Sequence, residues 1–210
     1  MAQHISILGN IGAGKSTMAS LIAREVDNIT YLKEPSLDQN PYLEVFTRSP
    51  KDAALHHQLW FLITGLDIVA QRITCAGTTV QDSSLLACPI FAEAMAHVGY
   101  MDLDDYRLYD QLCHKVIDQS PPPTLYIVVQ ASISILTRRI KTRARKSECE
   151  VSERYLSALQ ELHDTKLIDY WIARRSTKAI FIDTDRMDLR EPSLAQQIVN
   201  QIKFNLANEL

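Results

Sequence analysis

Short apolar runs alternate with longer amphipathic segments along the whole chain. Five short runs of four or five residues, rich in apolar or β-branched residues and ending at turn signals, are typical of strands; they cover residues 4–8, 29–33, 78–81, 125–129 and 179–182. Helical periodicity predicts eight helices, which cover residues 15 to about 26, 42–46, 51–75, 90–97, 103–118, 133–141, about 152 onward and around 194–202. The helix that begins near residue 152 carries Leu156, Leu159, Leu162 and Trp171 on one face. Strands of this kind separated by helices predict an α/β fold, a three-layer α/β/α arrangement with a parallel sheet covered on both faces.

Length and composition fit an ordinary globular domain. The 210 residues correspond to one domain, 1–210, and contain 46% hydrophobic and 22% charged residues with a net charge of -3. This balance favours neither a nucleic-acid nor a membrane partner. The four cysteines form no CxxC pair and no apolar stretch reaches the roughly 18 residues of a membrane span. We therefore expect a cytoplasmic protein with reduced thiols.

The most specific motif follows the first strand. It matches G-x-x-x-x-G-K-[ST] in full and consists of Gly9, Asn10, Ile11, Gly12, Ala13, Gly14, Lys15, Ser16 and Thr17. Glycines let the backbone turn its N–H groups toward phosphates, and the next helix adds its positive N-terminal end. Lys15 would reach the β- and γ-phosphates, and the Ser16 hydroxyl would bind Mg²⁺. The motif predicts a P-loop that binds ATP and Mg²⁺.

Carboxylates follow the second and third strands. Glu34 and Asp82 stand at the carboxyl ends of these strands, where ligands bind in parallel α/β sheets. Phosphoryl transfer needs a base for the attacking hydroxyl and a carboxylate near the metal. The two residues are candidates for these tasks; the competing interpretation is that each is a solvated turn residue.

A basic run lies at the end of the helix after the fourth strand. Residues 138–146 hold six cations, including Arg139, Arg143 and Arg145, and no acid. Guanidinium groups there would neutralise charge on a transferring phosphoryl group, which predicts an arginine-rich lid at about 141–151. A solvated helix face and a nucleic-acid phosphate site are the alternatives.

Together these motifs resemble the deoxynucleoside kinase family, a family of P-loop kinases, in its bacterial and phage type. The resemblance covers most of the chain and rests on the order of the P-loop, Lys33-Glu34-Pro35, Asn40-Pro41-Tyr42-Leu43-Glu44, His57-Gln58, Asp82-x-Ser84, the arginine run and Arg154-Tyr155-Leu156. The resemblance implies a fold with a five-stranded parallel sheet, usually in a homodimer. It also implies that the enzyme uses ATP to phosphorylate the 5′-hydroxyl of a deoxynucleoside.

The resemblance also implies roles for single residues. Glu34 would be the base for the 5′-hydroxyl, and Gln58 would pair with the edge of the nucleobase. Asp82 would lie near Mg²⁺ beside Ser16, and Arg139, Arg143 and Arg145 would be catalytic lid arginines acting with Lys15. Asp188 would contact the adenine of ATP. Further contacts with the substrate are implied for Tyr42, Phe46, Thr47, Trp60, Phe61, Ser83 and Cys88.

The predicted acceptor half departs from the family pattern. Ser83 replaces an arginine, Thr47 a tyrosine, Gly65 an arginine often found there, Cys88 an aspartate and Arg154 a glutamate. Each lost charge-assisted contact costs about 1.5–3 kcal/mol, so a bulkier or modified nucleoside would explain the changes. Two other functions remain open: a nucleoside monophosphate kinase or other small-molecule P-loop kinase, and a catalytically weak nucleotide-binding or assembly protein.

Overall fold

Five parallel strands form the centre of the molecule. The computed structural model describes residues 3–145, 151–186 and 191–207. The strands are β1 (His4–Leu8), β2 (Ile29–Leu32), β3 (Thr78–Gln81), β4 (Leu125–Gln130) and β5 (Lys178–Asp183), and they lie in the order β2-β3-β1-β4-β5. Every pairing is parallel. The predicted strands and the five-stranded parallel sheet are confirmed.

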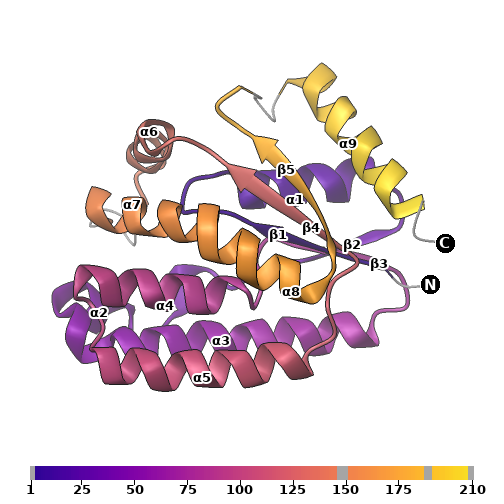
Figure 1. Ribbon diagram of the computed structural model, residues 1–210. Coiled ribbons are helices and arrows are strands. Elements are labelled where there is room, and N and C mark those ends of the chain that lie inside the picture. The colour runs from indigo at the N-terminus through magenta and orange to yellow at the C-terminus, as the bar shows by residue number, and fades with distance from the viewer. Residues whose placement is uncertain (1–2, 146–150, 187–190, 208–210) are drawn as a thin grey trace.

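Helices cover both faces of this sheet (Figure 1). One face is packed by α1 (Lys15–Glu25), α6 (Ile133–Arg143) and α9 (Pro192–Ala207). The other carries α3 (Pro50–Thr74), α4 (Ala87–Val98), α5 (Leu103–Gln119), α7 (Glu153–Leu162) and the π-helix η3 (His163–Ile172). Shorter pieces are the 3-10 helix η1 (Leu37–Gln39), α2 (Leu43–Arg48) and α8 (Ala173–Arg175). The three-layer α/β/α prediction is confirmed.

The helix boundaries differ from the prediction at two places. Helix α4 begins at Ala87 rather than near residue 90, because Pro89 falls in the first turn, where a missing N–H breaks no helical hydrogen bond. The helix expected from residue 152 changes to π geometry at His163, although Leu156, Leu159, Leu162 and Trp171 are buried as predicted.

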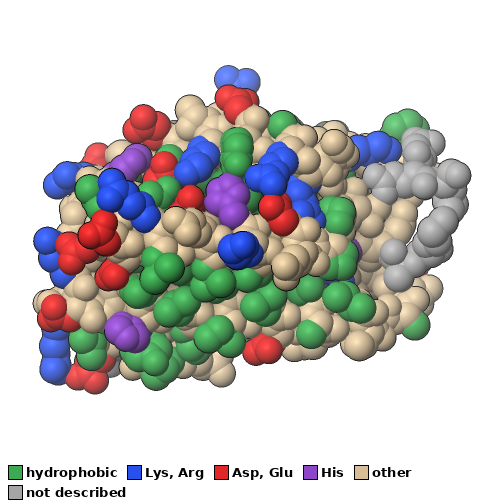
Figure 2. Space-filling model, turned by 60° about the horizontal axis from the view of Figure 1, so that its bottom comes forward, with side chains coloured by type: hydrophobic (Ala, Val, Ile, Leu, Met, Phe, Trp, Pro, Cys, Tyr) green, Lys and Arg blue, Asp and Glu red, His purple; other side chains and the backbone are tan. Residues whose placement is uncertain are grey.

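The outer surface of α3 and α5 is unusually apolar. The two helices lie side by side, joined at one end by an ion pair between Lys51 and Asp102 and at the other by Arg72, which donates to the Pro121 carbonyl. Figure 2 shows apolar side chains gathered across this side of the molecule. We define the α3–α5 face by its exposed apolar residues, Ile63, Leu66, Ile73, Leu108 and Leu112. No helix in the described parts of the chain is long and apolar enough to cross a membrane.

Candidate active site

A large cavity opens at the carboxyl edge of the sheet. Its volume is about 1220 Å³. Its walls come from the loops that follow β1, β2, β3 and β5, from α2, α3 and α4, and from the end of α6. The cavity has a polar end, at the P-loop, and an apolar end, between α2, α3 and α4. This is the position that parallel α/β topology predicts for a ligand.

Glycine is required at two points of the P-loop. Gly9 has φ +150°, and a Cβ there would lie 2.4 Å from the Val129 carbonyl oxygen. Gly12 has φ +83°, and its Cβ would lie 3.2 Å from the Leu136 carbonyl oxygen. The loop is therefore curled tightly against β4 and α6, as the motif predicts for a backbone that encloses phosphates.

Lys15 begins α1 and turns back over the loop. Its Nζ donates to the carbonyl oxygens of Gly9 and Asn10, at 2.9 and 3.0 Å. Asn10 itself is buried, with its side chain donating to the Leu156 carbonyl. Asn10 is not among the described residues that line the cavity, so its predicted contribution to the ATP site remains that of its backbone. The other residues from Gly9 to Thr17 line the cavity.

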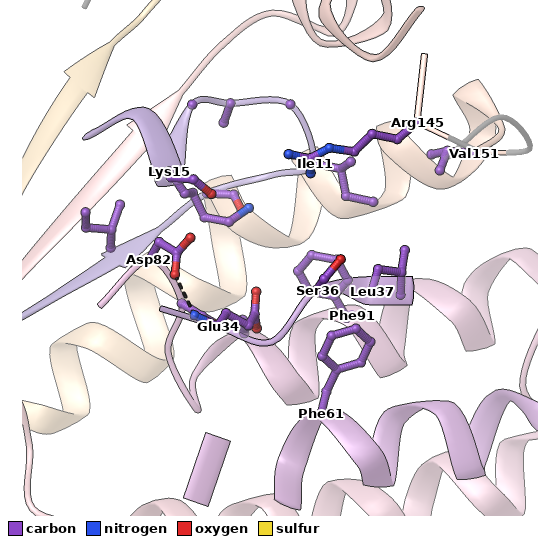
Figure 3. Close-up of a pocket in the computed structure, with 18 of the residues that line it drawn as sticks. Ile11, Lys15, Glu34, Ser36, Leu37, Phe61, Asp82, Phe91, Arg145 and Val151 are labelled. Carbon is purple, nitrogen blue, oxygen red and sulfur yellow. Dashed lines mark hydrogen bonds between the residues drawn. The ribbon is translucent and has the colours of Figure 1, made fainter. Parts of the chain in front are cut away.

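Glu34 and Asp82 lie together facing Lys15. The Glu34 backbone N–H donates to Asp82 Oδ1 at 3.0 Å, and Asp82 is buried. In Figure 3 both carboxylates project into the cavity below the Lys15 side chain. The strands explain this meeting, because β2 and β3 pair in register and the two acids follow their ends. The structure thus brings the two predicted acids to the P-loop.

The environment favours the protonated form of Glu34. Burial raises the pKa of this carboxyl, and the neighbouring Asp82 charge acts in the same direction. A hydrogen bond from the Ser83 side chain and the charge of Lys15 oppose the shift. Glu34 is therefore a carboxylate with a raised pKa, which suits a general base better than an ordinary exposed glutamate.

The predicted lid arginines line the same end of the cavity. Arg139 donates to Thr184 and to the carbonyls of Gly12 and Ala13, so it fastens α6 to the P-loop. Arg143 and Arg145 also line the cavity, and Figure 3 shows Arg145 extending toward Ile11. Residues 146–150 of the predicted lid, and the predicted adenine contact Asp188, lie outside the described residues.

Aromatic side chains and one amide form the apolar end. Phe61 and Phe91 project into the cavity from α3 and α4 (Figure 3), and Phe46 adds a further ring. Gln58 is buried among them, and its Nε2 donates to Met95 Sδ at 3.5 Å. Sulfur is a weak acceptor, so this amide can exchange its partner for a ligand at little cost.

His57 is a wall residue whose role the sequence did not predict. The Asn40 amide donates to its Nδ1 at 3.0 Å, which leaves the proton on Nε2. Burial lowers the pKa of His57 to about 4, so the ring is neutral. It stacks on Phe46 with the ring centroids 4.3 Å apart and the planes at 10°. This stack connects the Asn40 segment to α3.

Two predicted substrate contacts are not among the described residues that line the cavity. Tyr42 is 39% exposed and packs against His56. Trp60 packs edge-on against Phe61. A helix turns about 100° per residue, so Trp60 points away from the side of α3 that carries Gln58 and Phe61. We correct the predicted pocket by removing Tyr42 and Trp60.

The residues that depart from the family pattern mostly border the cavity. Ser83, Thr47, Gly65 and Cys88 all line it, whereas Arg154 is exposed and donates to the His97 carbonyl. Burial raises the pKa of the Cys88 thiol to about 12, so this position brings no charge to the pocket.

Gly65 lies in close contact with a neighbouring side chain. A Cβ there would lie 2.8 Å from Leu85 Cδ2. A larger side chain at this position would require Leu85 to move.

Several wall residues were missed from the sequence. Phe91 and Met95 lie four residues apart on α4 and both line the cavity, so helical periodicity applied from Cys88 onward would have indicated them. Tyr31, Tyr100 and Val151 also line it, and no local pattern distinguishes them from core residues.

Nearly the whole chain is similar to members of one enzyme family. The family model described as deoxynucleoside kinase matches residues 5–207. A deoxyadenosine kinase of Dictyostelium discoideum is 30% identical over 187 residues, which cover 88% of this chain and 76% of the relative. A deoxyadenosine/deoxycytidine kinase of Bacillus subtilis is 30% identical over 162 residues, covering 76% of this chain and 72% of the relative.

A solved structure of a deoxyadenosine kinase has the same fold as this chain. Deoxyadenosine kinase from M. mycoides with bound dCTP superposes with a TM-score of 0.81 at 23% identity, covering 96% of this chain and 99% of that one. The family match spans the P-loop, both carboxylates, the lid helix and the apolar pocket in one segment. The chain therefore belongs to the deoxynucleoside kinase family and is an ATP-dependent nucleoside kinase.

Proposed function

We propose that this enzyme transfers the γ-phosphoryl group of ATP to the 5′-hydroxyl of a deoxynucleoside, or of a modified nucleoside, to give the 5′-monophosphate. One observation carries the proposal: Glu34 and Asp82, joined by a hydrogen bond of 3.0 Å, lie between the P-loop lysine and an aromatic pocket. A base, a phosphate site and a pocket for a flat ring thus share one cavity.

At the polar end, the P-loop holds the phosphates of ATP. Lys15 leaves the carbonyls of Gly9 and Asn10 and contacts the β- and γ-phosphates. Arg143 and Arg145 close over the γ-phosphate, while Arg139 keeps α6 fastened to the P-loop. Cations at these positions stabilise the charge that spreads over the transferred group. Asp188 remains a predicted adenine contact.

Glu34 accepts the proton of the attacking hydroxyl. Its raised pKa gives the carboxylate more affinity for a proton than an ordinary glutamate has. The Ser83 hydroxyl lowers the pKa of Glu34, in the position where the family resemblance implies an arginine. A neutral hydroxyl orients the base without lowering its pKa as strongly as a guanidinium would.

Gln58 reads the nucleobase at the apolar end. Its amide offers a donor and an acceptor on one edge, and it gives up only the Met95 sulfur when a base arrives. Phe46, Phe61 and Phe91 supply the apolar walls. Thr47 and Cys88 are smaller than the residues they replace, which supports a nucleoside with an extra substituent as the preferred acceptor.

Ser16 and Asp82 would hold Mg²⁺. Both line the polar end and offer oxygen atoms, which this hard cation prefers. Asp82 uses Oδ1 for the Glu34 N–H, so its second carboxylate oxygen suits a metal or a metal-bound water. When bound, Mg²⁺ would neutralise charge on the β- and γ-phosphates.

We further propose that the enzyme is a cytoplasmic homodimer formed through the α3–α5 face. Leu108 and Ile73 on this face are 64% and 61% exposed, and clustered exposed apolar side chains are typical of an interaction site. A second copy is the occupant, because two neighbouring helices present a flat apolar stripe that a symmetry-related copy covers as a four-helix contact. Free thiols at Cys75, Cys88 and Cys113 agree with a reducing compartment.

Sedimentation or light scattering tests the dimer. We expect Leu108→Glu combined with Leu112→Glu to convert a dimer to a monomer, because two buried charges would face each other across the interface. Phe181→Glu, an equally apolar-to-acidic change on β5, is the control and should leave the dimer intact. A wild-type monomer at micromolar concentration contradicts the proposal.

The kinase activity is tested with γ-labelled ATP, Mg²⁺ and a panel of nucleosides, substituted nucleosides and nucleoside monophosphates. We expect label on the 5′-oxygen of one nucleoside class. Label on a monophosphate would instead indicate a nucleotide kinase. ATP binding without transfer to any acceptor would indicate a binding or assembly protein.

A further inference from the structure

One polar group at the phosphate end has no task in the reaction described above. Tyr31 lies on β2, paired in register with Val80 of β3, and packs partly against the core beneath α1. Its side chain also lines the cavity. The tyrosine thus extends from the sheet toward the P-loop end of the site.

The Tyr31 hydroxyl is buried and unsatisfied. Within residues 3–145, 151–186 and 191–207, its oxygen has no hydrogen-bond partner of normal geometry. Buried hydroxyls are nearly always paired in folded proteins, since an unpaired one loses its hydrogen bonds to water without replacement. A group of this kind beside a binding cavity is explained when a ligand supplies the partner.

The neighbours of this hydroxyl are the proposed metal ligands. Burial and then Asp82 raise the pKa of Tyr31, Ser16 opposes the shift, and Glu34 adds to it. Tyr31 lines the same cavity as Ser16 and Asp82, the two residues proposed to hold Mg²⁺, and it is paired with Val80, two residues before Asp82. Asp82 Oδ1 is taken by the Glu34 N–H, which leaves Oδ2 for the phenol and the metal.

We propose that Tyr31 is an outer-shell residue of the Mg²⁺·ATP site. When the metal is bound, the Tyr31 hydroxyl would donate to the Asp82 carboxylate and would accept a hydrogen bond from a water molecule on the metal. Groups that orient a metal ligand in this way typically contribute about 10- to 100-fold in metal affinity or activity. The inference rests on the proposed function, because it needs a metal–nucleotide complex at this end of the cavity.

The test compares nucleotide binding with and without metal in the Tyr31→Phe variant of the full chain. A non-hydrolysable ATP analogue is titrated calorimetrically in Mg²⁺ and in EDTA, and Mn²⁺ binding with the same analogue is followed by electron paramagnetic resonance. We expect the gain in affinity due to metal to fall by about 10-fold or more. Affinity in EDTA should stay within about twofold, because the variant leaves every phosphate contact in place.

Thermal unfolding without ligand separates a binding role from a structural one. Tyr31→Phe deletes only an unpaired buried hydroxyl, so the free variant should be at least as stable as the wild type. Tyr126→Phe removes another buried phenol, on β4 and apart from the cavity lining, and should leave the effect of metal unchanged. A free Tyr31→Phe protein that melts lower while its response to metal is intact overturns the inference.

A double-mutant cycle of Tyr31→Phe with Asp82→Asn tests whether Tyr31 affects metal binding through Asp82. If Tyr31 acts through Asp82, the double variant loses no more metal affinity than Asp82→Asn alone, and additive losses overturn this assignment. Weaker nucleoside binding with unchanged metal binding in Tyr31→Phe would also overturn it. A wild-type protein that binds the analogue equally in Mg²⁺ and EDTA would instead remove the proposed metal site itself.

Discussion

The two ends of the cavity are built by different means. The phosphate end consists largely of backbone: a glycine-rich turn between β1 and α1, the start of α1 and two residues that follow strands. The base end consists of side chains on α2, α3 and α4. Backbone cradles tolerate few substitutions because glycine φ angles and close contacts are required, whereas side-chain walls can change one residue at a time.

This difference bears on the positions where the sequence is expected to depart from the family pattern. Ser83, Thr47, Gly65 and Cys88 all border the cavity, yet Lys15 and the glycines of the P-loop are kept. The relatives differ in the nucleoside for which they are named, which is deoxyadenosine, deoxycytidine or deoxyguanosine. The comparison predicts that the two ends respond differently to mutation.

The largest expected effect comes from the base between the two ends. Glu34→Gln keeps the shape but removes proton acceptance, so kcat should fall by about 10²- to 10⁴-fold, while ATP affinity changes little. Steady-state kinetics and nucleotide titration measure the two quantities. Glu161→Gln, the same change on the exposed side of α7, is the matched control, and a kcat within about threefold of wild type for Glu34→Gln would refute the assignment.

An intermediate effect is expected at the base end. Gln58→Ala removes two hydrogen bonds to the nucleobase, each contributing about 0.5–1.5 kcal/mol, so kcat/KM for the nucleoside should fall roughly 10- to 100-fold. KM for ATP should remain unchanged, which the same kinetic assay shows. Gln71→Ala on an exposed turn of α3 is the control. Equal losses for both substrates would mean that Gln58 supports the fold rather than reads the base.

The smallest effect is a shift in pH dependence. Ser83 lowers the pKa of Glu34, so Ser83→Ala should raise it further. Because the base must be ionised, activity falls as pH drops through this pKa, and the acidic limb of kcat/KM should move to higher pH. Ser83→Arg should move the limb the other way. Coincident acidic limbs for the wild type and both variants would exclude Ser83 as the partner of Glu34.

Much of the phosphate end could be predicted from sequence, because its chemistry is local. The P-loop is one continuous segment, and Glu34 and Asp82 are identified by their position after strands. The carboxyl ends of parallel strands meet at one edge of a sheet. Residues that follow predicted strands are therefore also predicted to lie close together. The buried side chain of Asn10 could not be predicted in this way, since its hydrogen bond to the Leu156 carbonyl joins residues 146 positions apart.

The base end was less predictable, because it depends on which side of each helix faces inward. Trp60 and Phe61 are adjacent in sequence, yet only Phe61 lines the cavity. The phase of a helix within the fold follows from packing against other elements, such as the stack of His57 on Phe46. The π-helix at His163 was likewise missed, since no single residue marks it.

The central claim is that the phosphate end binds ATP in the ordinary way, whereas the base end accepts an altered nucleoside. The most direct test compares kcat/KM for ordinary deoxynucleosides with kcat/KM for nucleosides that carry substituents on the base or sugar. All assays use the same Mg²⁺ and ATP concentrations. We predict that at least one substituted nucleoside has a kcat/KM about 10-fold or more above that of the best ordinary deoxynucleoside, which corresponds to about 1.4 kcal/mol in transition-state binding. Ordinary deoxynucleosides that equal or exceed every substituted one would contradict the account.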